Sequence, residues 1–382
     1  MIKGFEQVNV YVEGLGVVKK TIKVEDGKIA KICDCKDKEG FIKLDDNLIV
    51  VPGFIDEHIH GSATADNMDA TMDAARTISK TIASEGVTSF LMTTMTEPEE
   101  HIEKAMVNAK NFIEANEHIG AKAIGLHLEG PFISVKHKGA QPEESIRKPD
   151  VEIFKHYQAL SGNNIKEITF AYEEDGKALA NYLRDTGVVA SIGHTDATCD
   201  QVLEAIKEGV SCATHTYNAM KPLHHREAGT VGGCLLSDDI YCELICDLIH
   251  VSPNAIKLLY KCKGKDKIVL ITDAMRAKHM PDGQYSLGGQ PVFVKDGAAR
   301  LENGTLAGSI LCMNDALKNI RKVLNTSFED TINFATKNPA MNLGIFDKKG
   351  SIKEGKDADF AVVDKDLNVY MTISEGHIVY KK

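Results

Sequence analysis

Eight short apolar runs dominate the chain between residues 49 and 340. They read IVVPGFIDEHIH, VTSFLMTT, AIGLHLEG, EITFAYEE, VVASIGHT, CATHTYNA, YCELICDLIH and KIVLITDA. Longer amphipathic segments separate them, and two of these, DATMDAARTISKTIASEG and DQVLEAIKEG, end in the glycine that often follows a helix. Strands that alternate with helices build parallel sheets, so eight such units predict an α/β fold with a (β/α)8 barrel.

The two ends of the chain have a different pattern. VNVYVEG and KTIKVEDGKIAKI near the start, and GSIKEGKDADFAVVDKDLNVYMTISEGHIVYKK at the end, read as short strands broken by glycine. We therefore predict a small β-sandwich domain from residues 1–51 and 345–382, and a catalytic barrel over residues 52–344. The stretch MPDGQYSLGGQPVFVKDGAARLENGTLAGS interrupts the alternation and predicts a β-hairpin insertion near 280–305, after the eighth strand.

Composition narrows the function classes. A net charge of −10 argues against nucleic-acid binding, which needs clustered Lys and Arg. No apolar run reaches the roughly 18 residues of a membrane span, and the start lacks the apolar segment of a secretory signal. The nine cysteines include no C-x-x-C pair, so we expect no disulfide framework and a reducing, cytoplasmic setting. Cys33 and Cys35 are close enough to share a metal, but buried or incidental thiols are the simpler expectation.

Polar side chains gather where the predicted strands end. The carboxyl ends of the strands of a (β/α)8 barrel meet on one face, which is where such barrels carry their active sites. The third and eighth runs bring the carboxylates of Glu129 and Asp273 to this face. Six of the 14 histidines occupy the same strand ends: His58, His60, His127, His194, His215 and His250.

A single histidine at a strand end is more often a hydrogen-bonded structural residue than a ligand. His194 and His215 on adjacent strands, with Glu129 nearby, nevertheless predict a metal-ligand set. His58 and His60 lie two apart and share one face of a strand, so they are either ligands or polar residues that close it.

Imidazole and carboxylate together suit zinc, iron or another divalent first-row metal. Such a metal can acidify a water, and a nearby carboxylate can accept its proton and later pass it to a leaving group. The strand ends therefore predict metal-assisted hydrolysis, and His127 is expected to be a packing or supporting residue.

Several motifs resemble those of a known family. PGFIDEHIHG resembles the first-strand motif of the amidohydrolase superfamily, and GSIKEGKDADFAVVD resembles its returning C-terminal segment. GLHLEGPF, SIGHTDA, THTYNAM, HHREAG, ITDAM and GTLAGS follow in family order along nearly the whole chain, and together resemble the N-acetylglucosamine-6-phosphate deacetylases. HLEGPF and GHTDA carry most of the specificity. The resemblance implies hydrolysis of N-acetyl-D-glucosamine 6-phosphate to D-glucosamine 6-phosphate and acetate, in amino-sugar catabolism.

The resemblance also implies roles for individual residues. Glu129, His194 and His215 would bind a divalent metal, zinc or iron, with Glu129 replacing the carbamylated lysine that many relatives carry on strand four. Asp273 matches the general acid/base, which deprotonates the attacking water and protonates the departing amine. Some members lack the first-strand histidines and bind one metal. This chain keeps both, so the resemblance implies one or two ions per subunit. The second ion would be bound by the first-strand histidines His58 and His60.

A substrate-binding set and a homodimer are implied as well. Arg226 would reach into the neighbouring subunit's active site and contact the substrate phosphate. Gln141 stands where some members carry a histidine, and it can donate a hydrogen bond but cannot carry a proton. The implied binding residues are Ala140, Gln141, Asn218, Ala219, Arg226, His250, Leu306, Ala307 and Gly308.

Three other functions stay open from the sequence. The substrate could be the galacto epimer, N-acetylgalactosamine 6-phosphate, because no residue decides between the two sugars. The chain could be another amidohydrolase acting on a cyclic amide or a nucleobase, although such enzymes usually need the lysine on strand four. It could also be a non-enzymatic binder of metal or sugar phosphate, but such a binder has no need of a base at Asp273.

Overall fold

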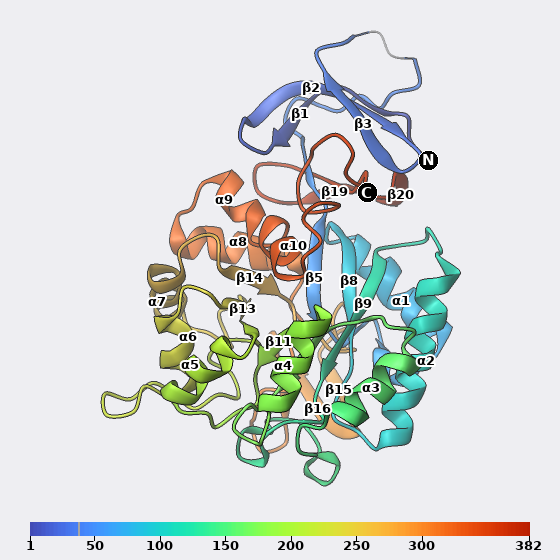
Figure 1. Cartoon of the computed structure of the whole chain (residues 1–382). Coiled ribbons are helices and arrows are strands. Elements are labelled where there is room, and N and C mark those ends of the chain that lie inside the picture. Colours follow the sequence, from blue (N-terminus) through green and yellow to red (C-terminus); the bar gives the residue numbers. More distant parts are fainter. Residues whose placement is uncertain (37–38) are drawn as a thin grey trace.

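The computed structural model describes residues 1–36 and 39–382, and eight parallel strands form its central sheet (Figure 1). Their order is β14-β13-β12-β11-β10-β9-β8-β5. Among the described residues no ladder joins β14 to β5, but the N–H of Asp273 donates to the carbonyl of His58 at 2.8 Å and closes the barrel at its carboxyl ends. The predicted barrel is confirmed. Its strands are β5 (Phe54–Ile59), β8 (Val87–Thr93), β9 (Lys122–Glu129), β10 (Ile165–Phe170), β11 (Val189–Ile192), β12 (Val210–Ala213), β13 (Tyr241–Ile245) and β14 (Ile268–Ile271).

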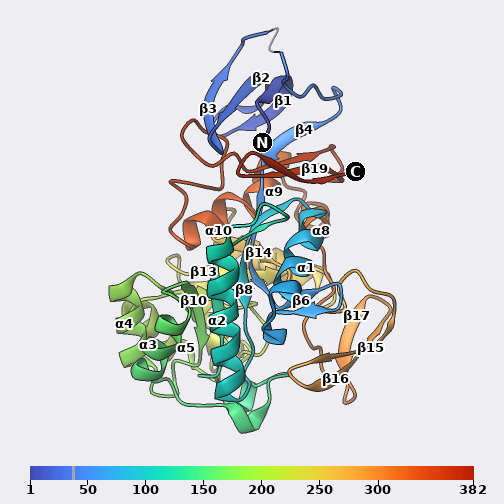
Figure 2. The same ribbon diagram turned by 90° about the vertical axis from the view of Figure 1, so that its right-hand side faces the viewer.

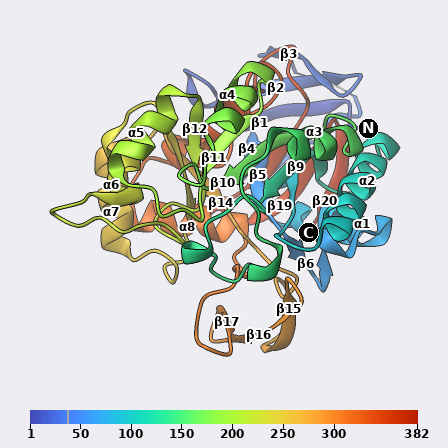
Figure 3. The same ribbon diagram turned by 60° about the horizontal axis from the view of Figure 1, so that its bottom comes forward.

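Helices cover the outside of the barrel (Figure 3). The two segments expected to be helical form α1 (Met72–Ala83) and α5 (Cys199–Lys207). Gly86 and Gly209 follow these helices with φ of +88° and +117°, a region that L side chains avoid, so the predicted stop signals act as expected. No helix in the described part of the chain is both long and apolar enough to cross a membrane. The others are α2 (Glu99–Ala115), α3 (Val151–Leu160), α4 (Lys177–Thr186), α6 (Gly229–Leu236), α7 (Pro253–Lys263), α8 (Met313–Leu324), α9 (Phe328–Asn333) and α10 (Lys337–Asn342).

Both chain ends build a second sheet, beside the amino ends of the barrel strands (Figure 2). The rings of Phe5 and Phe360 pack edge to face at 5.6 Å inside its apolar cluster. We predicted a small β-sandwich from both chain ends; a separate β unit built from both ends is confirmed, whereas the domain limits at 51/52 and 344/345 stay a prediction. The hydrogen bonds join all seven strands into one sheet, in the order β20 (His377–Lys381), β19 (Val369–Ser374), β18 (Phe360–Val363), β4 (Ile49–Pro52), β1 (Gly4–Val12), β2 (Gly16–Glu25) and β3 (Lys28–Cys33).

The terminal sheet leads straight into the barrel. Strand β4 lies between β1 and β18 in the terminal sheet, and only Gly53 separates it from β5. A Cβ atom at Gly53 would lie 2.2 Å from the side chain of Thr88, so this position has no room for a side chain. The strand that carries His58 is therefore anchored in the terminal sheet.

The insertion after the eighth strand has three strands, not the two of the predicted hairpin. They are β15 (Gly283–Leu287), β16 (Gln290–Lys295) and β17 (Ala298–Leu301), paired antiparallel. The missed turn is Asp296–Gly297, with φ of +52° and +80°, a pair typical of two-residue hairpin turns. Apolar side chains of this small sheet pack against Met95 and Met275 beside the barrel opening. Figure 2 shows the sheet beside the lower part of the barrel.

The expectation of free thiols at Cys33 and Cys35 is wrong. The two residues form a disulfide, with their Cα atoms 5.4 Å apart, a separation that suits a disulfide. Cys33 is the last residue of strand β3, and Cys35 follows two residues later. The other seven cysteines are free.

Candidate active site

Glu129, His194 and His215 converge at the carboxyl ends of β9, β11 and β12. Oε1 of Glu129 lies 3.3 Å from Nε2 of His194 and 3.2 Å from Nε2 of His215, and the two imidazole nitrogens are 3.1 Å apart. All three side chains are buried. Two nitrogens and one carboxylate oxygen this close together have the donor types that a divalent first-row metal prefers. The structure therefore brings together the three residues predicted as a ligand set, and they fit a metal ion.

The backbone at these strand ends is unusual. His194, His215 and Asp273 all have left-handed φ values, of 47°, 32° and 47°. Non-glycine residues adopt this conformation at a cost, and such strained positions cluster at functional sites. Three strands thus turn sharply at the point where each presents a polar side chain to the same space.

Hydrogen bonds fix which imidazole nitrogens face the site. Nδ1 of His194 lies 2.8 Å from the carbonyl oxygen of His137, and Nδ1 of His58 lies 3.1 Å from Oε2 of Glu243. A carbonyl or carboxylate oxygen accepts a hydrogen bond, so each Nδ1 carries a proton and each Nε2 is the nitrogen that faces the site and can bind a metal. Nε2 of His58 is buried without a hydrogen-bond partner. These supporting contacts orient the rings as metal ligands need.

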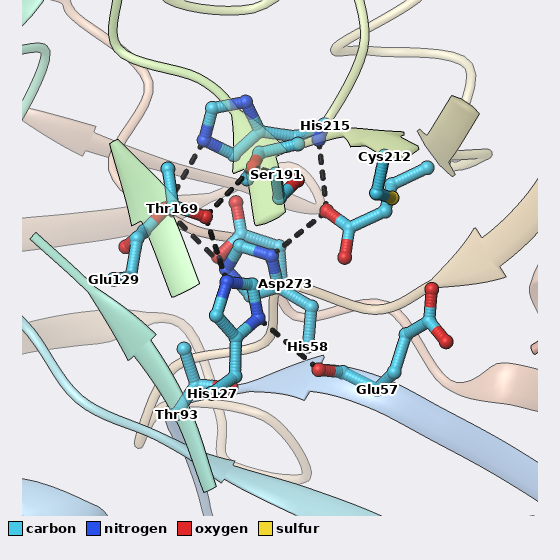
Figure 4. A network of polar contacts seen from close by, with 12 residues as sticks. Glu57, His58, Thr93, His127, Glu129, Thr169, Ser191, Cys212, His215 and Asp273 are labelled. Atoms are coloured by element: carbon cyan, nitrogen blue, oxygen red, sulfur yellow. Dashed lines mark hydrogen bonds and ion pairs between the residues drawn. The ribbon is translucent and has the colours of Figure 1, made fainter. Parts of the chain in front are cut away.

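His58 and His60 face the same space as the first ligand set. Nε2 of His60 lies 3.3 Å from Oε2 of Glu129 and 3.2 Å from Oδ1 of Asp273. Nε2 of His58 lies 3.5 Å from a carboxylate oxygen of each of these residues. Glu129 therefore lies between two pairs of histidines, and a second group of His58, His60 and Glu129 is also competent to hold a metal. Figure 4 shows His58, Glu129, His215 and Asp273 converging from different strands.

The carboxyl groups of the site have lowered pKa values despite their burial. Burial raises the pKa of Glu129, but the nearby histidines outweigh it and hold the pKa well below its usual range. The pKa of Asp273 is likewise lowered, by His58 and His60 against the effect of burial. Burial lowers the pKa of His58, but the carboxylates of Glu243, Glu129 and Asp273 raise it to about 9. Ionised carboxylates that raise an imidazole pKa in this way also attract a dication.

A cavity of about 200 Å³ opens directly above these residues. Predicted and unpredicted residues share its lining. Met95 and Leu287 supply apolar surface, and Leu287 comes from the inserted sheet. The sequence analysis predicted neither of these two residues, nor Gly139 and Thr305, which also line the cavity. Seven of the nine predicted substrate residues line it: Ala140, Gln141, Asn218, Ala219, His250, Leu306 and Gly308.

Two predicted substrate residues lie outside the cavity lining. Ala307 is buried in the apolar cluster beneath the inserted sheet, where its N–H donates to the carbonyl of Ala299 at 3.1 Å. Arg226 is exposed on the loop between β12 and α6, and within this chain it contacts His225. The loop geometry leaves the Arg226 guanidinium outside the cavity of its own chain.

Gln141 has a contact that the sequence did not reveal. Its Nε2 donates to Oε2 of Glu129 at 2.8 Å, and its Oε1 accepts the N–H of Thr96 at 2.7 Å. The amide thus holds the candidate metal ligand Glu129 in place. His127 lies below the site, and both its ring nitrogens have partners, Oγ1 of Thr169 and the carbonyl of Glu57.

Comparison with known proteins assigns the chain to a family. The profile of the amidohydrolase family matches residues 49–379. The chain belongs to the amidohydrolase family. Use of a divalent metal follows from this membership and from the ligand-competent groups described above.

Individual relatives narrow the comparison. This amidohydrolase is 46% identical to the N-acetylglucosamine-6-phosphate deacetylase of Bacillus subtilis (strain 168) over 363 residues, 94% of this chain and 92% of the relative. It is 36% identical to the N-acetylgalactosamine-6-phosphate deacetylase of Escherichia coli O157:H7 over 331 residues, 86% of this chain and 87% of the relative. A crystal structure of the N-acetylglucosamine-6-phosphate deacetylase of Thermotoga maritima matches with a TM-score of 0.90 at 38% identity, over 99% of this chain and 100% of that chain.

Proposed function

We propose that this amidohydrolase hydrolyses N-acetyl-D-glucosamine 6-phosphate to D-glucosamine 6-phosphate and acetate, in amino-sugar catabolism. The observation that carries the proposal is the convergence of Glu129, His194 and His215 with Asp273 at the base of one cavity. The alternative substrate is N-acetylgalactosamine 6-phosphate, which is supported by the relative named for that activity. A cytoplasmic location fits a soluble sugar-phosphate substrate.

Glu129, His194 and His215 would hold the catalytic metal, and His58 and His60 would share Glu129 with a second ion. Nitrogen and oxygen ligands suit zinc or iron. When bound, the metal lowers the pKa of water and polarises the acetamide carbonyl.

Asp273 is the proposed general base and acid. It accepts the proton of the attacking water as the new bond forms to the carbonyl carbon. It then returns a proton to the nitrogen as the carbon–nitrogen bond breaks, so acetate and the free amine leave. The lowered pKa of Asp273 leaves its carboxylate ionised and ready to accept the first proton. Gln141 keeps Glu129 oriented through its amide.

The proposed phosphate site combines both subunits of a homodimer. Asn218, the backbone at Ala219 and His250 line the far side of the cavity, and Arg226 would complete the site of the neighbouring subunit. His250 is held toward the cavity by Asp247, whose Oδ2 lies 2.6 Å from Nδ1 of His250. The remaining proposed sugar contacts are Ala140, Gln141, Leu306, Ala307 and Gly308.

One purified preparation tests the proposal. Acetate release is followed with N-acetylglucosamine 6-phosphate, its galacto epimer and unphosphorylated N-acetylglucosamine, and bound metal is counted by elemental analysis. Release confined to a phosphorylated sugar supports the proposal and names the epimer. Equal acetate release from the phosphorylated and the unphosphorylated sugars would indicate another amidase activity. Metal binding without release from any of the three sugars would contradict a deacetylase role.

A further inference from the structure

A second cluster of acidic side chains lies inside the barrel. It consists of Glu57 on β5, Glu167 on β10, Cys212 on β12 and Glu243 on β13, all four completely buried. Strands β8 and β9 separate β5 from β10 in the sheet, so side chains from these strands can meet only in the interior. Figure 4 shows Glu57 and Cys212 within the same polar network as His58. We call these four residues the interior acidic cluster.

Glu243 connects this cluster to the candidate active site. Its Oε2 accepts hydrogen bonds from Nδ1–H of His58 at 3.1 Å and from the N–H of His215 at 2.9 Å. Glu167 and Cys212 each lie two residues before a threonine, Thr169 or Thr214, and these threonines contact each other at 2.7 Å. The interior acidic cluster therefore occupies the next layer of the barrel toward its amino ends. That layer is usually filled by branched apolar side chains.

Several carboxylate oxygens of the cluster have no hydrogen-bond partner among the described residues. Nδ2 of Asn342 donates to Oε1 of Glu57 at 2.8 Å. In the described part of the chain, Oε2 of Glu57, both oxygens of Glu167 and Oε1 of Glu243 are buried with no hydrogen-bond partner. Burial, and next the charge of Glu243, raises the pKa of Glu167 well above its usual range. Unpaired buried carboxylates are costly, so something further must satisfy them.

We propose that the interior acidic cluster binds one divalent cation, coordinated by Glu57, Glu167, Glu243 and the thiolate of Cys212. One ligand atom from each residue lies within 4.8 Å of all the others. Four donors at about 2.0–2.3 Å from one ion would be separated by roughly this distance or less.

Charge and donor type support this site. Nδ1–H of His58 already donates to Glu243, and a dication would offset two of the four negative charges that three carboxylates and a thiolate bring. A thiolate among carboxylates favours zinc, iron(II) or cobalt over calcium and magnesium, and coordination deprotonates the thiol. The ion would join four strands across the barrel below the catalytic layer. This proposal does not depend on the deacetylase activity.

The competing explanation is that protons shared between the carboxyl groups neutralise the interior acidic cluster. Counting the bound metal distinguishes a bound cation from shared protons. Because the cluster is completely enclosed, the protein is produced in cobalt-supplemented minimal medium, so that the ion can enter during folding. We expect Glu167→Gln to hold one cobalt fewer per chain than the wild type, and Glu174→Gln, which changes a partly exposed glutamate, to match the wild type. Equal counts in Glu167→Gln and the wild type would overturn the proposal in favour of shared protons.

The absorption spectrum gives a second, independent readout. The candidate active site offers only nitrogen and oxygen ligands, so a thiolate-to-cobalt charge-transfer band reports a cysteine ligand elsewhere. Cys312 is the control, because in the described chain it is the other cysteine in a potential metal group, with Glu85 and His279. We expect the band in the wild type and in Cys312→Ser, and its loss in Cys212→Ser.

A missing band in the wild type, or a band lost in Cys312→Ser but kept in Cys212→Ser, would overturn the assignment. Circular dichroism establishes that each variant is folded. If Glu167→Gln does not fold, the cysteine variants alone decide.

Discussion

Glu129 and Glu167 lie on neighbouring strands of the same barrel, both buried, yet their surroundings differ completely. Burial alone raises the pKa of each carboxyl. Donors surround Glu129 and hold its pKa well below the usual range, whereas Glu167 faces other carboxylates and its pKa lies well above that range. The comparison shows that the facing groups, not the degree of burial, decide whether a barrel carboxyl is charged. The groups that face Glu129 are His58, His60, Gln141, His194 and His215.

A third buried carboxylate, Glu85, is neutralised in another way, by cationic side chains of the protein. Its Oε2 lies 2.8 Å from Nζ of Lys278, which is itself completely buried, and accepts the N–H of Met313 at 2.8 Å. Its Oε1 lies 2.9 Å from Nε2 of His279. The protein thus supplies the counter-charge of Glu85 from its own side chains. Glu129 is instead arranged for a metal. Among the described residues, Glu167 has neither a counter-charge nor a set of donors around it. The following predictions test these differences.

The largest effect is expected for Asp273→Asn. If the active-site carboxylates act as charged groups, removing this base should lower kcat by about 10²- to 10⁴-fold. Metal content should be retained, because the substitution spares Glu129, His194 and His215. Steady-state kinetics and elemental analysis of the same sample test both points. Turnover close to that of the wild type would remove Asp273 from the mechanism.

Lys278→Met is expected to be strongly destabilising. It leaves the Glu85 carboxylate buried without its main counter-charge, and breaking a buried pair from one side costs about 3–5 kcal/mol. Urea denaturation measures the change in the free energy of unfolding. The double variant Glu85→Gln/Lys278→Met is the control, and it should recover part of the loss since neither charge remains. A single variant as stable as the wild type would mean that water reaches the pair.

Arg226 tests the opposite extreme, an exposed charge. Hydrogen bonds to charged groups contribute about 1.5–3 kcal/mol, so Arg226→Ala should raise KM for the phosphorylated sugar by about 10- to 100-fold. KM for the unphosphorylated sugar should not change. Arg184→Ala, an exposed arginine on α4, should leave both values unchanged. Equal effects of Arg226→Ala on the two sugars would contradict its phosphate role.

The smallest effect concerns acid stability. Burial raises the pKa of Glu85, but Lys278 and His279 outweigh it and place the pKa below the ordinary 4.5. A lowered folded-state pKa gives stability that is present above the unfolded-state pKa and is lost as the pH falls through the folded-state value. We therefore expect the wild type to lose more stability between about pH 7 and pH 3 than Glu85→Gln/Lys278→Met. Urea unfolding at both pH values measures this, and parallel losses would rule it out.

The sequence predicted the site residues that can be recognised within a single strand. Polar residues at strand ends predicted Glu129, His194, His215 and Asp273, because parallel strands bring their carboxyl ends to one face. It did not predict contacts between side chains whose strands lie far apart in the sequence. Glu167 and Glu243 are each the one acidic residue of their strand, β10 or β13, and only barrel closure brings them together. The Gln141 contact to Glu129 depends on loop geometry that has no periodic signal.

The position of β4 has a consequence for synthesis of the chain on the ribosome. Residues 49–52 emerge early, but their antiparallel partners, residues 360–363, emerge only after all eight barrel strands. Until then β4 pairs only with β1 and presents an open strand edge, which can pair with another chain. A product truncated before residue 360 would keep that edge exposed permanently. Termination between the last barrel strand and residue 360 would therefore yield an aggregation-prone product.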